Sequence, residues 1–130
     1  MKKTILGTGI LFGLLAVVIG AFGAHGLEKV LTQESLATFE TGVKYQMYHA
    51  FFLLILGNLD IISNKTSKWV YYPITIGTVL FSFSIYFLAT NNLTNFDFKT
   101  IGFITPIGGL LLILGWAQLG YSVLKTSPKK

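Results

Sequence analysis

The chain has 130 residues, which suits one domain, and nothing in its sequence marks a second one. Apolar residues make up 52% of it and charged residues only 12%, whereas a soluble domain needs roughly a quarter of charged residues, so a water-soluble globular fold is excluded. The net charge of +5 comes from lysine alone, spread singly or in pairs between apolar runs, unlike the clustered Lys and Arg of a nucleic-acid-binding surface.

Four apolar segments are each long enough to cross about 30 Å of hydrocarbon as a helix. They cover residues 4–24, 43–59, 69–90 and 101–124. We therefore expect an all-α fold, an integral membrane four-helix transmembrane bundle forming a single domain over residues 1–130. The first segment resembles a secretory signal, but its apolar stretch is longer and residues 21–23 make a poor cleavage site, so it is expected to be retained.

The linker between the first two segments, residues 27–42, has its own pattern. Thr32 is suited to cap a helix, and Glu34 places a negative charge in the first turn, where it meets the helix dipole favourably. Apolar residues then recur at roughly helical spacing. This pattern predicts a short amphipathic helix on the outer membrane surface, which continues or bends into the second span.

The lysines predict the orientation of the spans, because cytoplasmic loops carry an excess of positive charge. With a cytoplasmic N-terminus, seven lysines lie inside and three lie outside. Both termini are thus expected in the cytoplasm of a multi-pass protein of the plasma membrane, or bacterial inner membrane. The inner lysines are Lys2, Lys3, Lys65, Lys68, Lys125, Lys129 and Lys130, and the outer ones are Lys29, Lys44 and Lys99. An aromatic belt at the inner boundary is expected from Trp69, Tyr71, Tyr72 and Tyr121.

Small residues recur in the first and fourth spans, where they would let helix backbones approach closely. Gly9 and Gly13 form a GxxxG pair, and the whole set expected to pack helices comprises Gly9, Gly13, Gly20, Ala24, Gly108, Gly109 and Gly115. Pro106 lies inside the fourth segment and lacks an N–H group, so a kink is expected near Thr105.

Polar residues near the outer end of the first two spans form the candidate site. Charged and polar groups in hydrocarbon are costly and usually have a role. The candidates are His25, Glu28, Glu40, Tyr45, Gln46 and His49, a cluster in the outer leaflet that would bind a metal, a quinone headgroup or protons. The alternative is a neutral histidine that joins helices by a hydrogen bond. Two histidines without HxxxH or HExxH spacing do not form a metal motif.

These patterns favour a non-enzymatic membrane protein that acts by packing against lipid or a partner. No hydrolase, phosphate-binding or dinucleotide motif is present, so no catalytic residue, metal or cofactor is expected. The expected partners are membrane lipids, a second copy or another membrane protein, and no nucleic acid. A binder or transporter of a small molecule or ion at the outer-leaflet cluster is the first alternative. An intramembrane enzyme centred on His25 and His49 is the second.

Three motifs in the chain resemble those of one family of small membrane proteins. They are GAFGAHG at residues 20–26, YQMYHA at residues 45–50, and GGL at residues 108–110 with Gly115 and Trp116. The family is known as domain of unknown function 423, or uncharacterised protein family 0382, and includes bacterial inner-membrane proteins and a eukaryotic transmembrane branch. The resemblance implies a plasma-membrane protein with four spans. It implies no reaction, substrate or active site.

Overall fold

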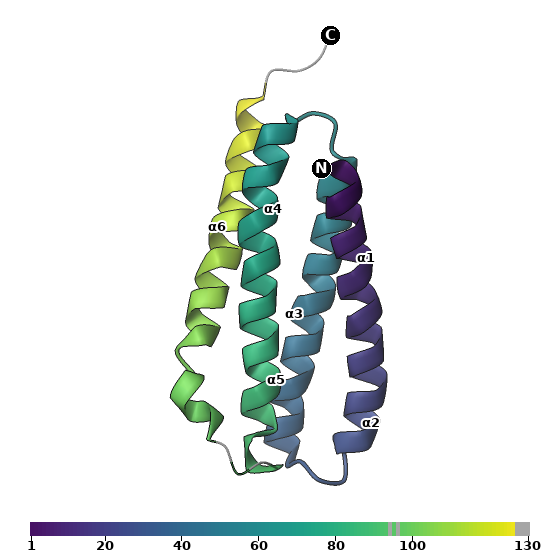
Figure 1. Cartoon of the computed structure of the whole chain (residues 1–130), viewed down its shortest axis with the longest axis vertical. Coiled ribbons are helices and arrows are strands. Elements are labelled where there is room, and N and C mark those ends of the chain that lie inside the picture. Colours follow the sequence, from purple (N-terminus) through teal and green to yellow (C-terminus); the bar gives the residue numbers. More distant parts are fainter. Residues whose placement is uncertain (94, 96, 127–130) are drawn as a thin grey trace.

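The structure, a computed structural model, describes residues 1–93, 95 and 97–126, apart from the side chain of Ala24. Four helical rods lie side by side along one axis (Figure 1). The first rod comprises α1 (Lys2–Val18), a π-helical turn η1 (Ile19–Gly23) and α2 (Ala24–Leu27), and the second is α3 (Gln33–Asn58). The third comprises α4 (Asn64–Thr78), the π-helical turn η2 (Val79–Phe83) and α5 (Ser84–Ala89). The short 3-10 turns η3 (Asn91–Leu93) and η4 (Phe98–Ile101) precede α6 (Ile104–Lys125). No strand occurs among the described residues, so the predicted all-α bundle is confirmed.

The first and second rods pack antiparallel along their length because glycines remove the side chains between them. A Cβ atom on Gly9 would lie 3.0 Å from the carbonyl oxygen of Ala50, and one on Gly20 would lie 3.1 Å from Val43 Cγ1. At Gly13 the nearest atom, Ala50 Cβ, would be 3.6 Å away, which is an ordinary contact. Only small residues at the first two positions thus permit this approach. The side chain of Ala24 lies outside the described part.

The third and fourth rods pack even more closely. A Cβ atom on Gly108 would lie 2.5 Å from the main-chain nitrogen of Phe81 in η2, and one on Gly115 would lie 2.5 Å from Ile74. A Cβ atom on Gly109 would lie 3.6 Å from the ring of Phe81, which is an ordinary contact, so this position has room for a methyl group. The two tight glycines therefore set the distance between α6 and the rod formed by α4, η2 and α5.

The linker predicted to form an amphipathic helix is the beginning of α3. The hydroxyl of Thr32 accepts a hydrogen bond from the N–H group of Ser35 at 3.1 Å, so the predicted N-cap is confirmed. The helix then runs without a break to Asn58, so the amphipathic segment continues into the second span rather than bending into it. As a result, the second helix begins ten residues before the apolar segment that starts at residue 43.

The kink expected near Thr105 is absent, because α6 begins only at Ile104. Pro106 therefore lies in the first turn, where an N–H group has no intrahelical partner to lose. The interruption falls instead at the 3-10 turn η4, and Gly102 and Phe103 connect this turn to α6.

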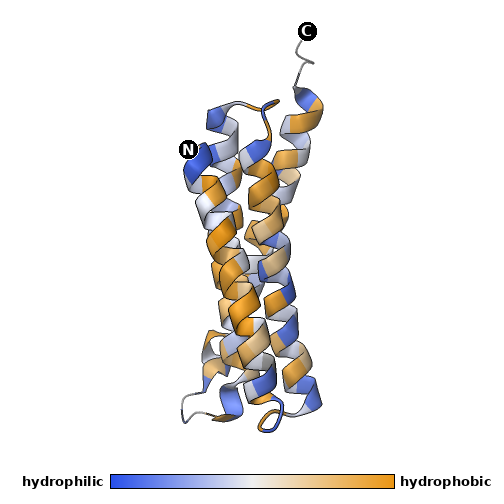
Figure 2. Ribbon diagram, turned by 90° about the vertical axis from the view of Figure 1, so that its right-hand side faces the viewer, coloured by the Kyte–Doolittle hydropathy of each residue, from blue (hydrophilic) through white to orange (hydrophobic). Residues whose placement is uncertain are grey.

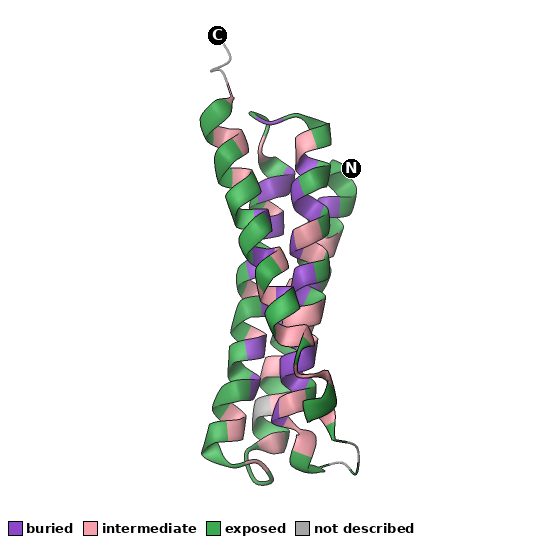
Figure 3. Cartoon of the chain, turned by 90° about the vertical axis from the view of Figure 1, so that its left-hand side faces the viewer, coloured by how far each residue is buried: buried purple, intermediate pink, exposed green. Residues whose placement is uncertain are grey.

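The outer surface of the bundle is apolar along its middle and hydrophilic at its ends (Figure 2). In the described part, three helical stretches are long and apolar enough to cross a membrane, Lys2–Leu27, Asn64–Ala89 and Phe98–Lys125. Exposed residues cover most of α6 in Figure 3. The remaining long helix, α3, is less apolar, since it carries exposed charged residues such as Glu40 and Lys44 as well as Gln46 and His49, whose side chains are buried inside the bundle.

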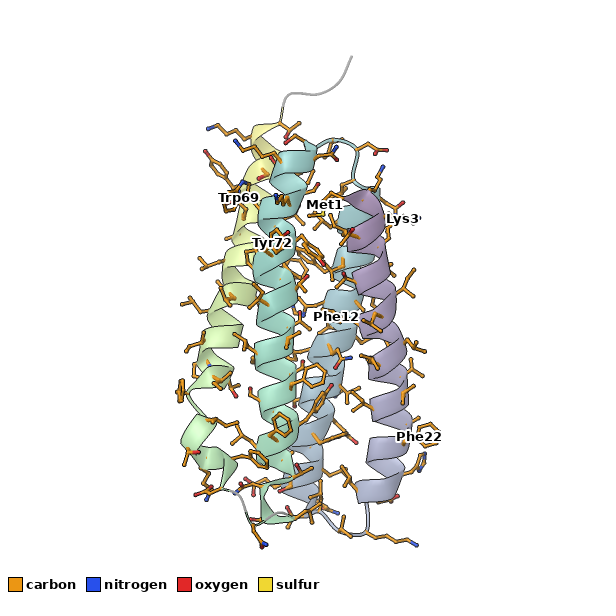
Figure 4. The ribbon with its side chains drawn as sticks, viewed as in Figure 1. Met1, Lys3, Phe12, Phe22, Trp69 and Tyr72 are labelled. Atoms are coloured by element: carbon orange, nitrogen blue, oxygen red, sulfur yellow. The ribbon has the colours of Figure 1, made fainter. Side chains whose placement is uncertain are left out.

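The N-terminus, the connection between α3 and α4, and the end of α6 lie at the same end of the bundle (Figure 1). Figure 4 shows Trp69 and Tyr72 near this end, on the outside of α4, and both are exposed. Tyr121 of α6 is exposed as well. Tyr71, which was expected in the same aromatic belt, is instead buried, with its hydroxyl 2.8 Å from that of Thr8 on α1. Tyr71 therefore connects α4 to α1.

Candidate functional site

A buried glutamine on α3 connects three helices at the centre of the bundle. Gln46 has no exposed surface, and its Nε2 atom donates a hydrogen bond to the carbonyl oxygen of Phe12 on α1 at 2.9 Å. The hydroxyl of Tyr86 on α5 donates to Gln46 Oε1 at 2.7 Å. One helical turn earlier in the third rod, the hydroxyl of Ser82 donates to the carbonyl oxygen of Gly42 at 2.8 Å. These bonds satisfy polar groups that are buried inside the bundle, away from solvent.

One turn further along α3, a histidine connects it to the fourth helix. The indole N–H group of Trp116 on α6 donates a hydrogen bond to His49 Nε2 at 3.0 Å. Nε2 must therefore be unprotonated, so Nδ1 carries the proton and donates it to the carbonyl oxygen of Tyr45 at 2.6 Å. The pair of bonds fits a neutral imidazole with both nitrogens engaged. Gln46 and His49 together thus tie α3 to each of its three neighbours.

The hydrogen-bonded centre lies near the middle of the bundle and not at the end that holds α2. The segment carrying Gln46 and His49 lies beside Gly13, whose nearest neighbours are Ala50 and Met47. Gly13 is eleven residues from the start of the Lys2–Leu27 stretch and fourteen from its end. Gln46 and His49 therefore lie about midway along the bundle, further from α2 than the predicted cluster with His25 requires.

Three of the other four predicted site residues do not join this centre. His25, Glu28 and Glu40 are exposed, and among the described residues no hydrogen bond or ion pair connects them to each other or to His49. Gly23, two residues before His25, packs against Phe39, which lies ten residues, or about 15 Å of helix, before His49. The predicted cluster is thus not formed. Within the described part of the chain, no three His, Asp or Glu side chains gather as metal ligands would.

An apolar groove of about 530 Å³ lies between α3 and α6, and the hydrogen-bonded residues His49 and Trp116 form part of its lining. Aromatic rings form much of its wall, and Trp116 packs edge-on against Phe52 with 4.5 Å between ring centroids. Tyr45, which was predicted in the site, belongs to this wall and is 40% exposed. The full lining comprises Tyr45, Tyr48, His49, Phe51, Phe52, Ile55, Trp116 and Leu119.

A second cavity, of about 670 Å³, opens at the end of the bundle that holds the N-terminus. Its lining includes Lys2 and Asp60, whose side chains form an ion pair at 2.6 Å. Both side chains are largely exposed, and such surface pairs contribute little to stability. This cavity is therefore open to solvent at its charged rim and is a weaker candidate for a binding site than the apolar groove.

Sequence reasoning missed the partners of Gln46 and His49. Tyr86 lies within an otherwise apolar segment, one turn after Ser82, and this spacing of two hydroxyl groups could have indicated a face directed at another helix. Trp116 lies in the middle of the fourth apolar segment, away from the boundaries where tryptophan usually lies. An indole N–H group at that depth needs a partner in the protein, which was the available signal.

The comparisons with known proteins place these features in a family. A family model described as "Protein of unknown function (DUF423)" matches residues 19–109. A UPF0382 membrane protein of Staphylococcus epidermidis is 39% identical over 123 residues, which cover 95% of this chain and 97% of the relative. The UPF0382 membrane protein YwdK of Bacillus subtilis is 37% identical over 128 residues, with 95% of this chain and 98% of the relative covered.

A more distant relative extends the comparison. The UPF0382 inner membrane protein YgdD of Escherichia coli is 35% identical over 120 residues, which cover 90% of this chain and 86% of the relative. No solved structure matches the chain. The motifs, the apolar helical bundle and these relatives agree, and the resemblance seen in the sequence is confirmed. The chain belongs to the DUF423 family of UPF0382 membrane proteins.

Proposed function

We propose that this protein crosses the plasma membrane, or bacterial inner membrane, four times with both termini in the cytoplasm, and that it is a non-enzymatic protein that holds a lipid acyl chain against its side. The observation that carries the lipid proposal is the apolar groove between α3 and α6. The name of the Escherichia coli relative supports the choice of membrane.

The arrangement of α3 supports the fourth crossing. Three stretches are long and apolar enough to span a membrane, and α3 lies antiparallel to the first of them, with Gly57 against Leu6 near one end and Val43 against Gly20 further along. A helix of 26 residues is about 39 Å long, which exceeds the hydrocarbon thickness. Two of its polar side chains, Gln46 and His49, are buried against other helices, where hydrogen bonds satisfy them.

The distribution of lysine supports the orientation. The end of the bundle with the N-terminus would face the cytoplasm and carry seven of the ten lysines, two of which, Lys129 and Lys130, lie outside the described residues. Exposed Trp69, Tyr72 and Tyr121 near this end would then lie at the inner boundary of the membrane.

The chemistry of the groove favours an acyl chain as its occupant. Both nitrogens of His49 and the indole N–H group of Trp116 are already hydrogen-bonded, so this side of the groove offers no free donor or acceptor. From Tyr45 to Ile55 its α3 wall extends over about 15 Å. Tyr45 lies midway along α3 and Ile55 lies near the end that would face the cytoplasm, so the groove covers the inner half of the bilayer, which suits the acyl chain of an inner-leaflet lipid.

The test is native mass spectrometry of the protein released from membranes in detergent, which counts retained lipids. Ile55→Phe narrows the groove, and Ile113→Phe is the matched control because Ile113 is an exposed isoleucine on α6 outside the groove. We expect one retained lipid in the wild type and in Ile113→Phe, and its loss in Ile55→Phe. Equal retention by both variants would show that the lipid binds elsewhere, and no retention by the wild type would refute the proposal.

The transporter and enzyme alternatives have less support. Both require His25 and His49 to share a site, whereas His49 is buried between α3 and α6 and His25 is exposed on α2. A neutral histidine bonded to a tryptophan is the arrangement expected of a helix-joining contact. The two histidines thus support a role in folding rather than a shared ligand.

A further inference from the structure

A glutamine on the outer face of α6 has no bonding partner within the described part of the chain. Gln118 is exposed, and no hydrogen bond of the described residues involves its amide. It lies seven residues before Lys125, where α6 ends, so it lies about 10 Å from that end of the helix. Tyr121, which would lie at the inner boundary of the membrane, is three residues or about 4.5 Å further along α6, so Gln118 lies just inside the hydrocarbon core.

The direction of α6 keeps this amide away from water. In a helix each Cα–Cβ bond tilts toward the N-terminus, and the N-terminus of α6 is at the far end from Lys125. The side chain of Gln118 therefore leans toward the middle of the membrane and not toward the nearer boundary. A polar group in that position needs a hydrogen-bonding partner, because lipid tails supply none.

The face around Gln118 is separate from the lipid groove. At about 100° per residue, Trp116 and Gln118 point to nearly opposite sides of α6. Leu114 and Tyr121, which are four residues before and three residues after Gln118, share its face and are 52% and 60% exposed. Ala117, beside Gln118, is also exposed and small enough to admit another helix closely.

We propose that a second copy of this chain packs against this face of α6, with the two Gln118 amides hydrogen-bonded to each other across a two-fold axis. A primary amide is self-complementary, because it has donors on nitrogen and an acceptor on oxygen. The two-fold axis of a membrane dimer runs along the membrane normal, and residues of α6 that face this axis meet their equivalents, so Nε2 of each amide would donate to Oε1 of the other. A second copy thus satisfies the hydrogen-bonding groups of both amides, and no other protein is required.

The test uses cysteine cross-linking in native membranes, which is clean because the chain has no cysteine of its own. Leu114→Cys and Tyr121→Cys report on the proposed face, and Val17→Cys on exposed α1 is the control. We expect disulfide-linked dimers from the first two variants and none from the third. Equal cross-linking at Val17 would indicate random collision and would overturn the proposal, as would the absence of dimers.

A second substitution tests the amide itself. Gln118→Leu, placed in the Tyr121→Cys background, is expected to lower the dimer yield about tenfold, in line with the strength of amide contacts between membrane helices. Gln118→Asn keeps the amide and is expected to keep most of the dimer. Because Gln118 is exposed, both variants should fold, which far-ultraviolet circular dichroism can verify. An undiminished dimer in Gln118→Leu, or cross-linking only to a different protein, would refute the interface.

Discussion

Replacement of Gln46 by the similarly sized methionine should destabilise the bundle through one particular group. The carbonyl oxygen of Phe12 keeps its partner within α1, so losing its bond to Gln46 costs little. The hydroxyl of Tyr86 loses its acceptor while it stays buried. An orphaned buried group costs about 1–3 kcal/mol, and interhelical hydrogen bonds in membrane proteins average about 0.6 kcal/mol. We therefore expect Gln46→Met to lower the free energy of unfolding by about 2 kcal/mol, or about 30-fold in the equilibrium constant.

The assay is equilibrium unfolding in mixed micelles with increasing sodium dodecyl sulfate, followed by far-ultraviolet circular dichroism. Tyr86→Phe alone should cost about 1 kcal/mol, because the Gln46 oxygen then lacks its donor. The double variant should be less destabilised than the sum of the two single variants, since it leaves neither group unpaired. Gln118→Met, measured at a dilution that keeps the chain monomeric, is the matched control and should change little.

Strict additivity of the two substitutions would refute this reasoning. It would mean that Gln46 and Tyr86 act independently, in spite of the 2.7 Å between their oxygen atoms. A fully stable Gln46→Met variant would be equally damaging, because the orphaned hydroxyl would then carry no cost.

Three further predictions concern packing, topology and the indole bond. Gly108→Ala should destabilise the bundle by about 1–3 kcal/mol in the same unfolding assay, because its Cβ would lie 2.5 Å from a main-chain nitrogen, whereas Gly109→Ala should be tolerated. Thr126→Cys should react with a membrane-impermeant maleimide only in inverted vesicles and Lys99→Cys only in intact cells; the opposite labelling would reverse the proposed orientation. Trp116→Phe should lower the free energy of unfolding by about 1 kcal/mol, because the histidine that accepts its N–H group becomes unpaired, and an unchanged value would show that this bond contributes nothing.

The helical fold could be predicted from the sequence because the membrane imposes it. A backbone in lipid can satisfy its polar groups locally only as a helix. Apolar stretches as long as residues 4–24 therefore predict helices. The cap at Thr32 follows from local chemistry for the same reason. The start of α3 at Gln33 follows from the predicted cap at Thr32, whereas hydropathy alone indicates only the apolar part from residue 43 onward.

The site could be predicted only in part, because its geometry depends on distant segments. Gln46 and His49 were selected from the cost of polar groups in hydrocarbon, and the structure gives both of them partners. Their partners on α1, α5 and α6 follow from the angle and depth at which the helices pack, which one sequence does not specify. His25 and His49 both lie near the predicted outer ends of their spans, but similar positions along two helices do not bring two side chains together in space.

The wide turn η2 takes up one extra residue in the third rod. A π-helical turn holds one residue more than an α-helical turn, and Tyr86 reaches Gln46 from the segment that follows it. Deleting a single residue between Val79 and Phe83 would convert the wide turn into an ordinary one and leave the direction of α5 nearly unchanged. The tyrosine would then still point toward α3, so the third rod can lose one residue at this turn without losing the bond between Tyr86 and Gln46.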